Sequence, residues 1–206
     1  MKKLVLVLTA MMAVACSQTP EEKATALIQE SVKKSLYHPD SYDPVETMVD
    51  SAFAPMDDPV FYEKSLKVCH LSVELQKYTE EAKRAQSSMA IWQNSWDAFS
   101  KNKYNDAKKE NDTYNEKIEL LEAKIQKVGE DMMELVESGR KFIGFKVTHK
   151  FRAKNNKGNT LMGKNVYITD ENFTKILAEY NTDSEDYKLV QELYRQCKEE
   201  AEYAKE

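Results

Sequence analysis

Residues 61–138 read FYEKSLKVCHLSVELQKYTEEAKRAQSSMAIWQNSWDAFSKNKYNDAKKENDTYNEKIELLEAKIQKVGEDMMELVES, and this stretch decides the fold. It contains no glycine before Gly129, and no proline occurs in the chain after Pro59. Because glycine and proline are the residues that most weaken a helix, their absence favours long helices.

Apolar residues recur in this stretch at alternating steps of three and four, the spacing of a coiled-coil seam. The first seam comprises Val68, Leu71, Leu75, Tyr78, Ala82, Ala85, Met89, Trp92, Trp96 and Phe99. The second comprises Tyr104, Ala107, Asn111, Tyr114, Ile118, Leu121, Ile125, Val128, Met132 and Leu135.

The step from Phe99 to Tyr104 fits neither spacing, so the phase of the seam breaks there. We therefore predict an antiparallel helical hairpin over residues 60–138, with its turn at residues 101–102. In this register Ala85 faces Ile118, so that small side chains meet large ones. The alternative is one continuous helix, which would have to ignore the break in phase.

The first residues of the chain have the pattern of a secretion signal. Lys2 and Lys3 precede an apolar stretch, residues 4–15, that is too short to span a bilayer. The stretch ends in Ala13-Val14-Ala15-Cys16, which resembles a bacterial lipobox. We predict a lipoprotein signal peptide over residues 1–15 and lipid attachment at Cys16. The alternative is an ordinary secretory signal that happens to precede a cysteine.

The remaining sequence predicts an α+β body, predominantly helical, with a small antiparallel sheet and flanking helices. Thr19 and Glu22 form a capping box for a helix that ends before Pro39. Residues 45–53, 142–153 and 161–168 are expected strands, because polar and apolar residues alternate in them. Residues 171–180 and 185–204 are expected helices, the second packing against the base of the hairpin. The predicted domains are therefore residues 16–59 plus 139–206 for the body, and 60–138 for the inserted hairpin.

This order of elements carries a resemblance. The pattern Leu36-x-x-Pro39-x-Ser41-Tyr42, followed by a strand and a later Asn155–Gly158 turn, resembles small Bacteroidota lipoproteins of uncharacterised function. That resemblance covers residues 16–54 and 142–169 and implies a lipid-anchored α+β domain without known chemistry. Glu21-Glu22 also resembles their surface-display signal, so an outer-membrane lipoprotein facing the medium is preferred over one facing the periplasm.

Composition and motifs argue against several classes of function. The chain has 30 basic and 35 acidic residues, with no basic run of five, which argues against a nucleic-acid partner. No metal, phosphate-binding or nucleophile motif occurs. We expect His38, His70 and His149 to be structural, and we expect no enzymatic activity, cofactor or metal. A disulfide between Cys69 and Cys197 is considered, but two free thiols are preferred.

Two groups of residues are candidates for binding. The aromatic residues near the predicted turn are Trp92, Trp96, Phe99 and Tyr104. They either contact a partner or membrane, or pack within the seam, which their heptad positions favour. The basic residues on one face of the second strand are Lys146, Lys150, Arg152 and Lys154. They either bind phosphates or acidic glycans, or form a solvated face, which is preferred.

The combined prediction is a lipid-anchored cell-envelope protein that acts as a non-enzymatic interaction or scaffold protein. Its helical arm would contact another envelope component, which we expect to be a protein. The alternative is a surface binding module that holds a small ligand or glycan on its sheet.

Replacing the predicted lipidated cysteine, Cys16→Ala, is expected to release the protein into the soluble fraction and to abolish metabolic labelling with a fatty acid. The matched control is Cys69→Ala, which should remain membrane-bound and labelled. Labelling that persists in Cys16→Ala would contradict the lipobox interpretation.

Overall fold

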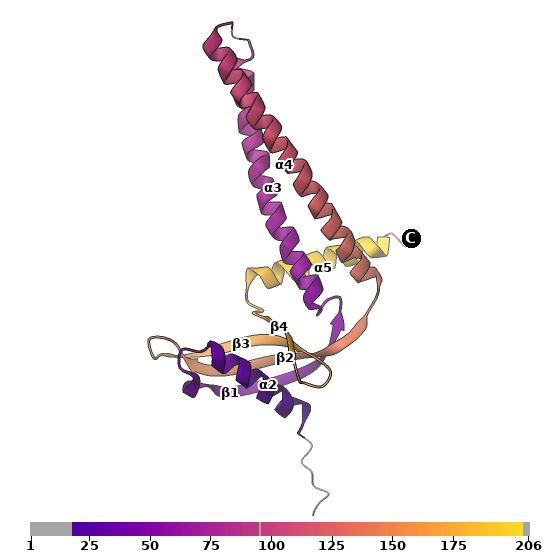
Figure 1. The fold of residues 1–206 in the computed structure, drawn as a ribbon. Helices are drawn as coiled ribbons and strands as arrows, with labels where there is room; N and C mark the ends of the chain where they lie inside the picture. The colour runs from indigo at the N-terminus through magenta and orange to yellow at the C-terminus, as the bar shows by residue number, and fades with distance from the viewer. Residues whose placement is uncertain (1–17, 95, 204–206) are drawn as a thin grey trace, which may run out of the picture. The chain divides into compact units, whose positions relative to one another are not determined.

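The computed structural model describes residues 18–94 and 96–203 of the chain (Figure 1). The predicted α+β class is confirmed, since an antiparallel four-stranded sheet is combined with helices that include a long hairpin. Two compact units are present. The first comprises residues up to Ala52 together with Ile143–Thr182, and the second comprises Phe53–Phe142 together with the residues from Asp183 onward.

The sheet has the order β1 (Asp43–Ala54), β2 (Lys141–Lys154), β3 (Thr160–Thr169) and β4 (Ile176–Tyr180). A short 3-10 helix, η1 (Pro39–Ser41), precedes β1. The predicted alternation in β2 is confirmed, because Val147, His149, Phe151 and Ala153 are all buried. Phe151 lies opposite Gly163 of β3, and its ring occupies the space where a Cβ atom at position 163 would be.

Helix α2 (Pro20–Ser35) covers one face of this sheet. The predicted capping box is present, with Thr19 and Glu22 bonding each other's backbone N–H groups at 3.2 and 2.9 Å. The core of the first unit is formed by three α2 residues and four strand residues: Ala24, Ile28, Val32, Val147, Phe151, Ala153 and Tyr167.

The prediction of a helix over residues 171–180 is wrong. Asp170 instead forms a tight turn, since its carboxylate accepts hydrogen bonds from the backbone N–H groups of Thr174 (2.7 Å) and Lys175 (2.9 Å). Phe173 adopts a positive φ of 55° within this turn. The chain then returns as β4, with Tyr180 buried and Glu179 exposed in the alternation of a strand.

The hairpin of the second unit consists of α3 (Pro59–Trp92) and α4 (Ala98–Glu137). Asp58 caps α3, accepting from the Val60 N–H at 2.8 Å, and Pro59 occupies the first helical position. The predicted seams do face each other, since Ala82, Ala85 and Ala107 are buried between the helices together with Leu121, Val128 and Met132.

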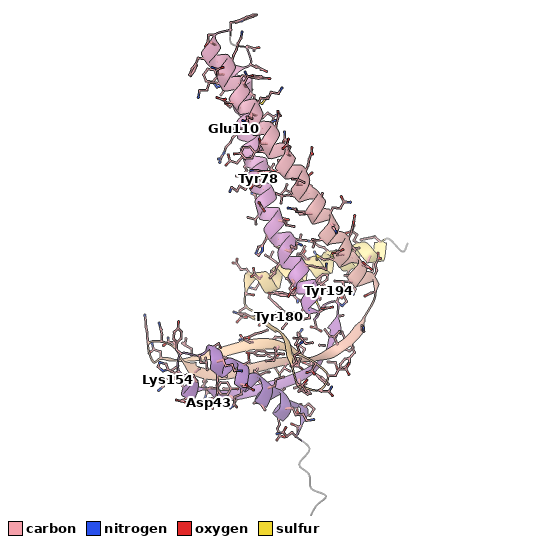
Figure 2. All side chains as sticks on the ribbon, in the orientation of Figure 1. Asp43, Tyr78, Glu110, Lys154, Tyr180 and Tyr194 are labelled. Carbon is pink, nitrogen blue, oxygen red and sulfur yellow. The ribbon has the colours of Figure 1, made fainter. Side chains whose placement is uncertain are left out.

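The predicted register of the hairpin is wrong. The helices are joined by residues 93–97, before the predicted turn at 101–102. Tyr78 stacks on Tyr114 with ring centroids 6.0 Å apart (Figure 2), whereas the predicted register placed Tyr78 opposite Ile125, eleven positions further on. Eleven residues make about three helical turns, so the shift leaves the same side chains facing inward.

Two contacts pair the helices at this register. The ammonium group of Lys117 lies over both stacked rings, 4.8 Å from the centroid of Tyr78 and 5.6 Å from that of Tyr114. Nearer the base, Lys64 of α3 pairs with Asp131 of α4 at 2.5 Å. The hydrogen bond and charge of Lys64 hold the pKa of Asp131 below its usual value.

Helix α5 (Glu185–Tyr203) packs across the base of the hairpin, as expected. Tyr194 meets Phe61 edge-on, with centroids 5.6 Å apart (Figure 2), and Val190 joins Val128 and Met132 in the same core. The predicted domain boundaries therefore need correction, because α5 belongs to the unit of the hairpin and not to that of the sheet.

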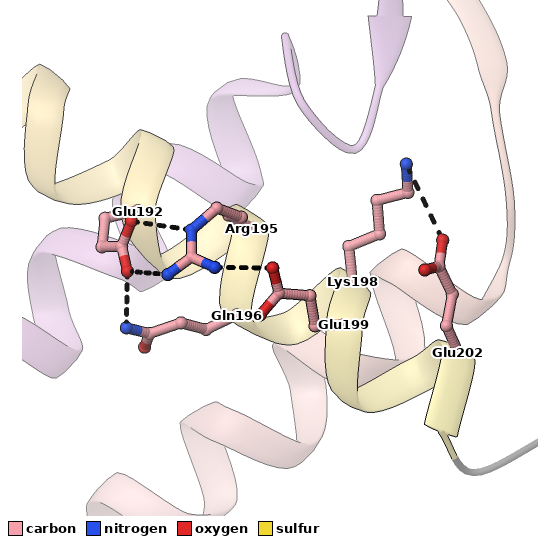
Figure 3. Close-up of polar contacts among 6 residues, drawn as sticks. All are labelled: Glu192, Arg195, Gln196, Lys198, Glu199 and Glu202. Atoms are coloured by element: carbon pink, nitrogen blue, oxygen red, sulfur yellow. Dashed lines mark hydrogen bonds and ion pairs between the residues drawn. The ribbon is translucent and has the colours of Figure 1, made fainter.

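The outer face of α5 is occupied by ion pairs within the helix (Figure 3). Arg195 lies between Glu192 and Glu199, and Lys198 pairs with Glu202 at 3.8 Å. Hydrogen bonds from Arg195 and Gln196 lower the pKa of Glu192. Such pairs at helical spacing support the helix itself and leave its charges compensated.

Cysteines placed at Ala85 and Ala107 are expected to crosslink within one chain, because both positions are buried in the seam at the observed register. The pair Ala85 and Ile118 is the matched control and should remain reduced, since position 118 lies about 16 Å further along α4. Mass spectrometry of non-reduced peptides distinguishes the two registers, and crosslinking of the 85–118 pair alone would restore the predicted one.

Candidate functional site

The end of the hairpin exposes a group of large apolar side chains. We call residues 91–104 the tip. Trp96 is 91% exposed and Phe99 is 62% exposed, and Ile91 is exposed as well. Trp92 and Tyr104 are half-buried. The preferred interpretation that the tip aromatics pack within the seam is therefore wrong for Trp96 and Phe99.

The exposure of these residues follows from the position of the turn. Because α3 ends at Trp92 and α4 begins at Ala98, Trp96 lies in the connection and not in either helix. Sequence analysis did not identify Ile91 as a candidate for binding. Ile91 lies between Met89 and Trp92 in α3, and those two residues already occupy the seam. An apolar residue off the seam is the signal that could have identified it.

Asp97 is the residue that sets where α4 begins. Its carboxylate accepts the backbone N–H of Ser100 at 2.9 Å and the Ser100 hydroxyl at 2.7 Å, the geometry of a helix N-cap. Both bonds stabilise the ionised form, so the side-chain bond and then the backbone bond from Ser100 lower the pKa of Asp97. At the end of α3, the Gln93 N–H closes the last turn on the Met89 carbonyl at 2.9 Å.

The apolar side chains of the tip contact one another only in part. Trp92 meets Phe99 edge-on, with centroids 6.0 Å apart at an interplanar angle of 89°. The ammonium group of Lys103 lies 5.7 Å from the centroid of Phe99. These contacts brace Trp92 and Phe99 at the ends of the two helices, while Trp96 remains almost fully in solvent.

The tip also differs from the rest of the chain in charge. Residues 85–96 include no Asp, Glu, Lys, Arg or His, although 32% of the chain is Asp, Glu, Lys or Arg. The next charged positions are Asp97, which caps the helix, and then Lys101 and Lys103. Exposed isoleucine and tryptophan side chains on an uncharged run of the chain are suited to burial against another molecule, because few charges there have to be desolvated.

The basic residues of β2 are compensated within their own sheet. Lys150 pairs with Glu46 of β1 at 2.5 Å, and Arg152 lies 3.7 Å from Asp43 of the same strand. Lys146 is half-buried and interacts with its surroundings. Lys154 is exposed (Figure 2). Its backbone N–H donates to Ser41 Oγ at 2.8 Å. The structure thus places carboxylates beside two of the four cations.

His149 is a buried structural residue, as expected. Thr25 donates its hydroxyl proton to the Glu21 carbonyl (2.7 Å), so it accepts from the Thr47 hydroxyl (2.8 Å). Thr47 in turn accepts from His149 Nδ1–H (2.9 Å), which leaves His149 Nε2 to accept from the Tyr42 hydroxyl (2.7 Å). Burial lowers the pKa of His149, so the neutral imidazole that this chain of bonds requires is favoured.

Cys69 and Cys197 are free, half-buried thiols, and burial raises the pKa of each. His38 and His70 are exposed. Residues 1–15 and Cys16 lie outside the described residues. Over residues 18–94 and 96–203, no three His, Cys, Asp or Glu side chains form a group that could hold a metal ion.

Comparison with known protein families, curated proteins and solved structures finds no match to this chain. Within the described part of the chain, no helix combines the length and apolar character needed to cross a bilayer. The tip and the hairpin that carries it are therefore the basis on which a function is proposed.

Replacing Tyr42 by phenylalanine is expected to lower the free energy of unfolding by about 1–3 kcal/mol, because it leaves the buried His149 Nε2 without a donor. Tyr37→Phe is the matched control, since Tyr37 is exposed five residues earlier and should tolerate the change. Urea denaturation followed by circular dichroism measures both. Equal stability of the two variants would show that the Tyr42 hydroxyl contributes nothing.

Proposed function

We propose that this protein is a lipid-anchored, non-enzymatic interaction protein of the cell envelope, and that the tip of its helical hairpin makes the contact with another envelope component. The observation that carries the proposal is the exposure of Trp96 and Phe99 at the end of the hairpin, where Asp97 caps α4. Tryptophan is among the side chains that most often dominate the binding energy of interfaces, and phenylalanine is enriched at their cores.

The hairpin is suited to holding such a contact at a distance. Helices of 34 and 40 residues extend about 50 and 60 Å at 1.5 Å per residue. The stacked tyrosines and the Lys64–Asp131 pair keep the two helices together along this length. The base is braced by α5 through Phe61 and Tyr194. The tip is thereby presented at the end of a supported arm, not on a free loop.

The proposal involves no catalytic step. The histidine that the fold buries most deeply, His149, bonds through both ring nitrogens and is fully shielded from solvent. Its hydrogen bonds have the character of a structural network that ties α2 and η1–β1 to β2. The aromatic residues of the tip offer apolar surface, which supports binding and supplies no acid, base or nucleophile.

Lipid anchoring at Cys16 and location at the outer membrane enter the proposal from the lipobox and from the resemblance to Bacteroidota lipoproteins. A lipid chain on Cys16 would hold the protein at a membrane without a spanning helix. The alternative of ligand binding on the sheet receives less support, because Glu46 and Asp43 already accompany Lys150 and Arg152.

A photoreactive amino acid placed at Gln93, an exposed position of the turn, is expected to form an adduct with another envelope component when the full chain is irradiated in intact cells. The matched control is Lys109, an exposed position on the side of α4. Adducts from position 93 and few from position 109 support contact through the tip. No adduct from 93, or equal adducts from both, would contradict it.

A further inference from the structure

We infer that the component contacted by the tip is the interfacial layer of an anionic phospholipid bilayer, into which Trp96 and its apolar neighbours insert. This inference rests on the proposed function, since it names the partner of the same surface. It commits to lipid in place of the protein partner expected from sequence, and four properties of the tip carry it.

The first property is the kind of side chain exposed. Ile91, Trp96 and Phe99 are exposed at the end of a helical hairpin. Tryptophan is enriched where membranes meet water, because its ring is apolar while its N–H needs a polar partner. Phe99 and Ile91 supply apolar area without any group to hydrogen-bond, as the acyl boundary requires.

The second property is the kind of charge beneath the apolar residues. The nearest cations on α4 are both lysines, Lys101 and Lys103, against the single carboxylate of Asp97. Interfaces with proteins are depleted in lysine and enriched in arginine, whereas lysines beside an apolar surface are attracted to anionic lipid. Arg84, the nearest arginine, is paired with Glu81 at 3.0 Å. Charge complementarity therefore favours an anionic bilayer.

The third property is depth. Lys101 and Lys103 lie three and five residues into α4, about 5 and 8 Å below its first residue along the helix axis. An interfacial element buries its apolar side about 5–10 Å into the boundary between headgroups and acyl chains. Inserted to that depth, the apolar end of the tip reaches the acyl boundary, and the long side chains of Lys101 and Lys103 extend to the lipid phosphates, Lys103 leaving its position over the Phe99 ring.

The fourth property limits how far the tip can enter. Gln93, Asn94, Trp96 and Asp97 lie outside both helices, and non-helical backbone exposed to lipid is not tolerated in the hydrocarbon core. Asp97 is ionised and uses its oxygens to cap α4. Both features keep the tip in the headgroup region, so the contact is interfacial and does not span the bilayer.

The chain provides its own probe for this inference, because Trp92 and Trp96 are its two tryptophans and both lie in the tip. In a Trp92→Phe variant, which retains a ring against Phe99, all tryptophan emission comes from position 96. The full chain is inserted through its anchor into phosphatidylglycerol–phosphatidylethanolamine vesicles that contain lipids brominated on the acyl chains. In a parallel arm, the vesicles that hold the anchored protein contain no brominated lipid, and separate vesicles with brominated lipid are added afterwards.

We expect Trp96 emission to shift to shorter wavelength and to be quenched in one of these arms. Quenching in the first arm indicates contact with the bilayer that holds the anchor, and quenching in the second indicates contact with another bilayer. Phe99→Asp should abolish the quenching. Val73→Asp should not, although Val73 is 69% exposed on the side of the hairpin and is thus a matched apolar position. Lys101→Gln and Lys103→Gln should each lower the ratio of inserted to free tip about fivefold.

Asp97→Asn provides a change in the opposite direction. Asparagine caps helices as well as aspartate does, so this variant keeps the start of α4 while removing the one negative charge of the tip. It should increase quenching in anionic vesicles. Circular dichroism of every variant checks that the helices are retained.

Trp96 emission that remains that of a water-exposed indole in both arms, in protein that is bound to the vesicles, overturns the inference. So does an equal loss of quenching in Phe99→Asp and Val73→Asp. A protein adduct from photoreactive Gln93 without lipid adducts would also overturn it while leaving the proposed function intact, whereas the absence of any adduct would contradict both.

Discussion

The hydrogen bonds between Asp97 and Ser100 are the interaction on which the second unit depends. By capping α4 at Ala98 they place the connection between the helices at residues 93–97, where the observed register requires it. The stacking of Tyr78 on Tyr114 and the Lys64–Asp131 pair belong to that register. The same cap leaves Trp96 outside both helices, where its side chain is exposed.

The first unit depends on a polar interaction of a different kind. His149 faces the core side of β2, where an unpaired imidazole would be costly, and it is accommodated because Tyr42 and Thr47 reach both of its nitrogens. The chain of hydroxyls then continues to Thr25 and the α2 backbone. A directed sequence of bonds therefore fixes how α2 and β1 lie on the sheet, which apolar contacts alone specify less sharply.

Sequence reasoning predicted the faces of the elements better than their ends. Heptad spacing identified seam residues such as Ala82, Ala107 and Leu121 correctly, although not Trp96 and Phe99. Such a pattern is nearly unchanged by a shift of three helical turns. Complementary side-chain sizes favoured the wrong register, and the capping potential of Asp97 was the information needed to reject it. The helix predicted over residues 171–180 is wrong because periodicity does not reveal a turn that is closed by a side chain, here the carboxylate of Asp170. The candidate site was located by its aromatic residues, while their exposure depended on the position of a turn that periodicity does not determine.

The placement of the hairpin in the chain has a consequence for how the sheet assembles. β1 and β2 are neighbours in the sheet, yet residues 55–140 separate them in sequence. At the base of the hairpin, the ring centroids of Phe53 and Phe142 are 5.9 Å apart, and the Arg140 guanidinium lies 3.6 Å from the centroid of the Phe53 ring. Once the two helices have paired, the loop that joins β1 to β2 consists of residues 55–58 and 138–140, about twelvefold shorter than residues 55–140, which lowers the chain-entropy cost of pairing the strands by roughly 2 kcal/mol. The pairing of β1 with β2, which are far apart in sequence, thus becomes effectively local once α3 and α4 have paired. The effective contact order of the sheet is therefore set by the coiled coil inserted into it.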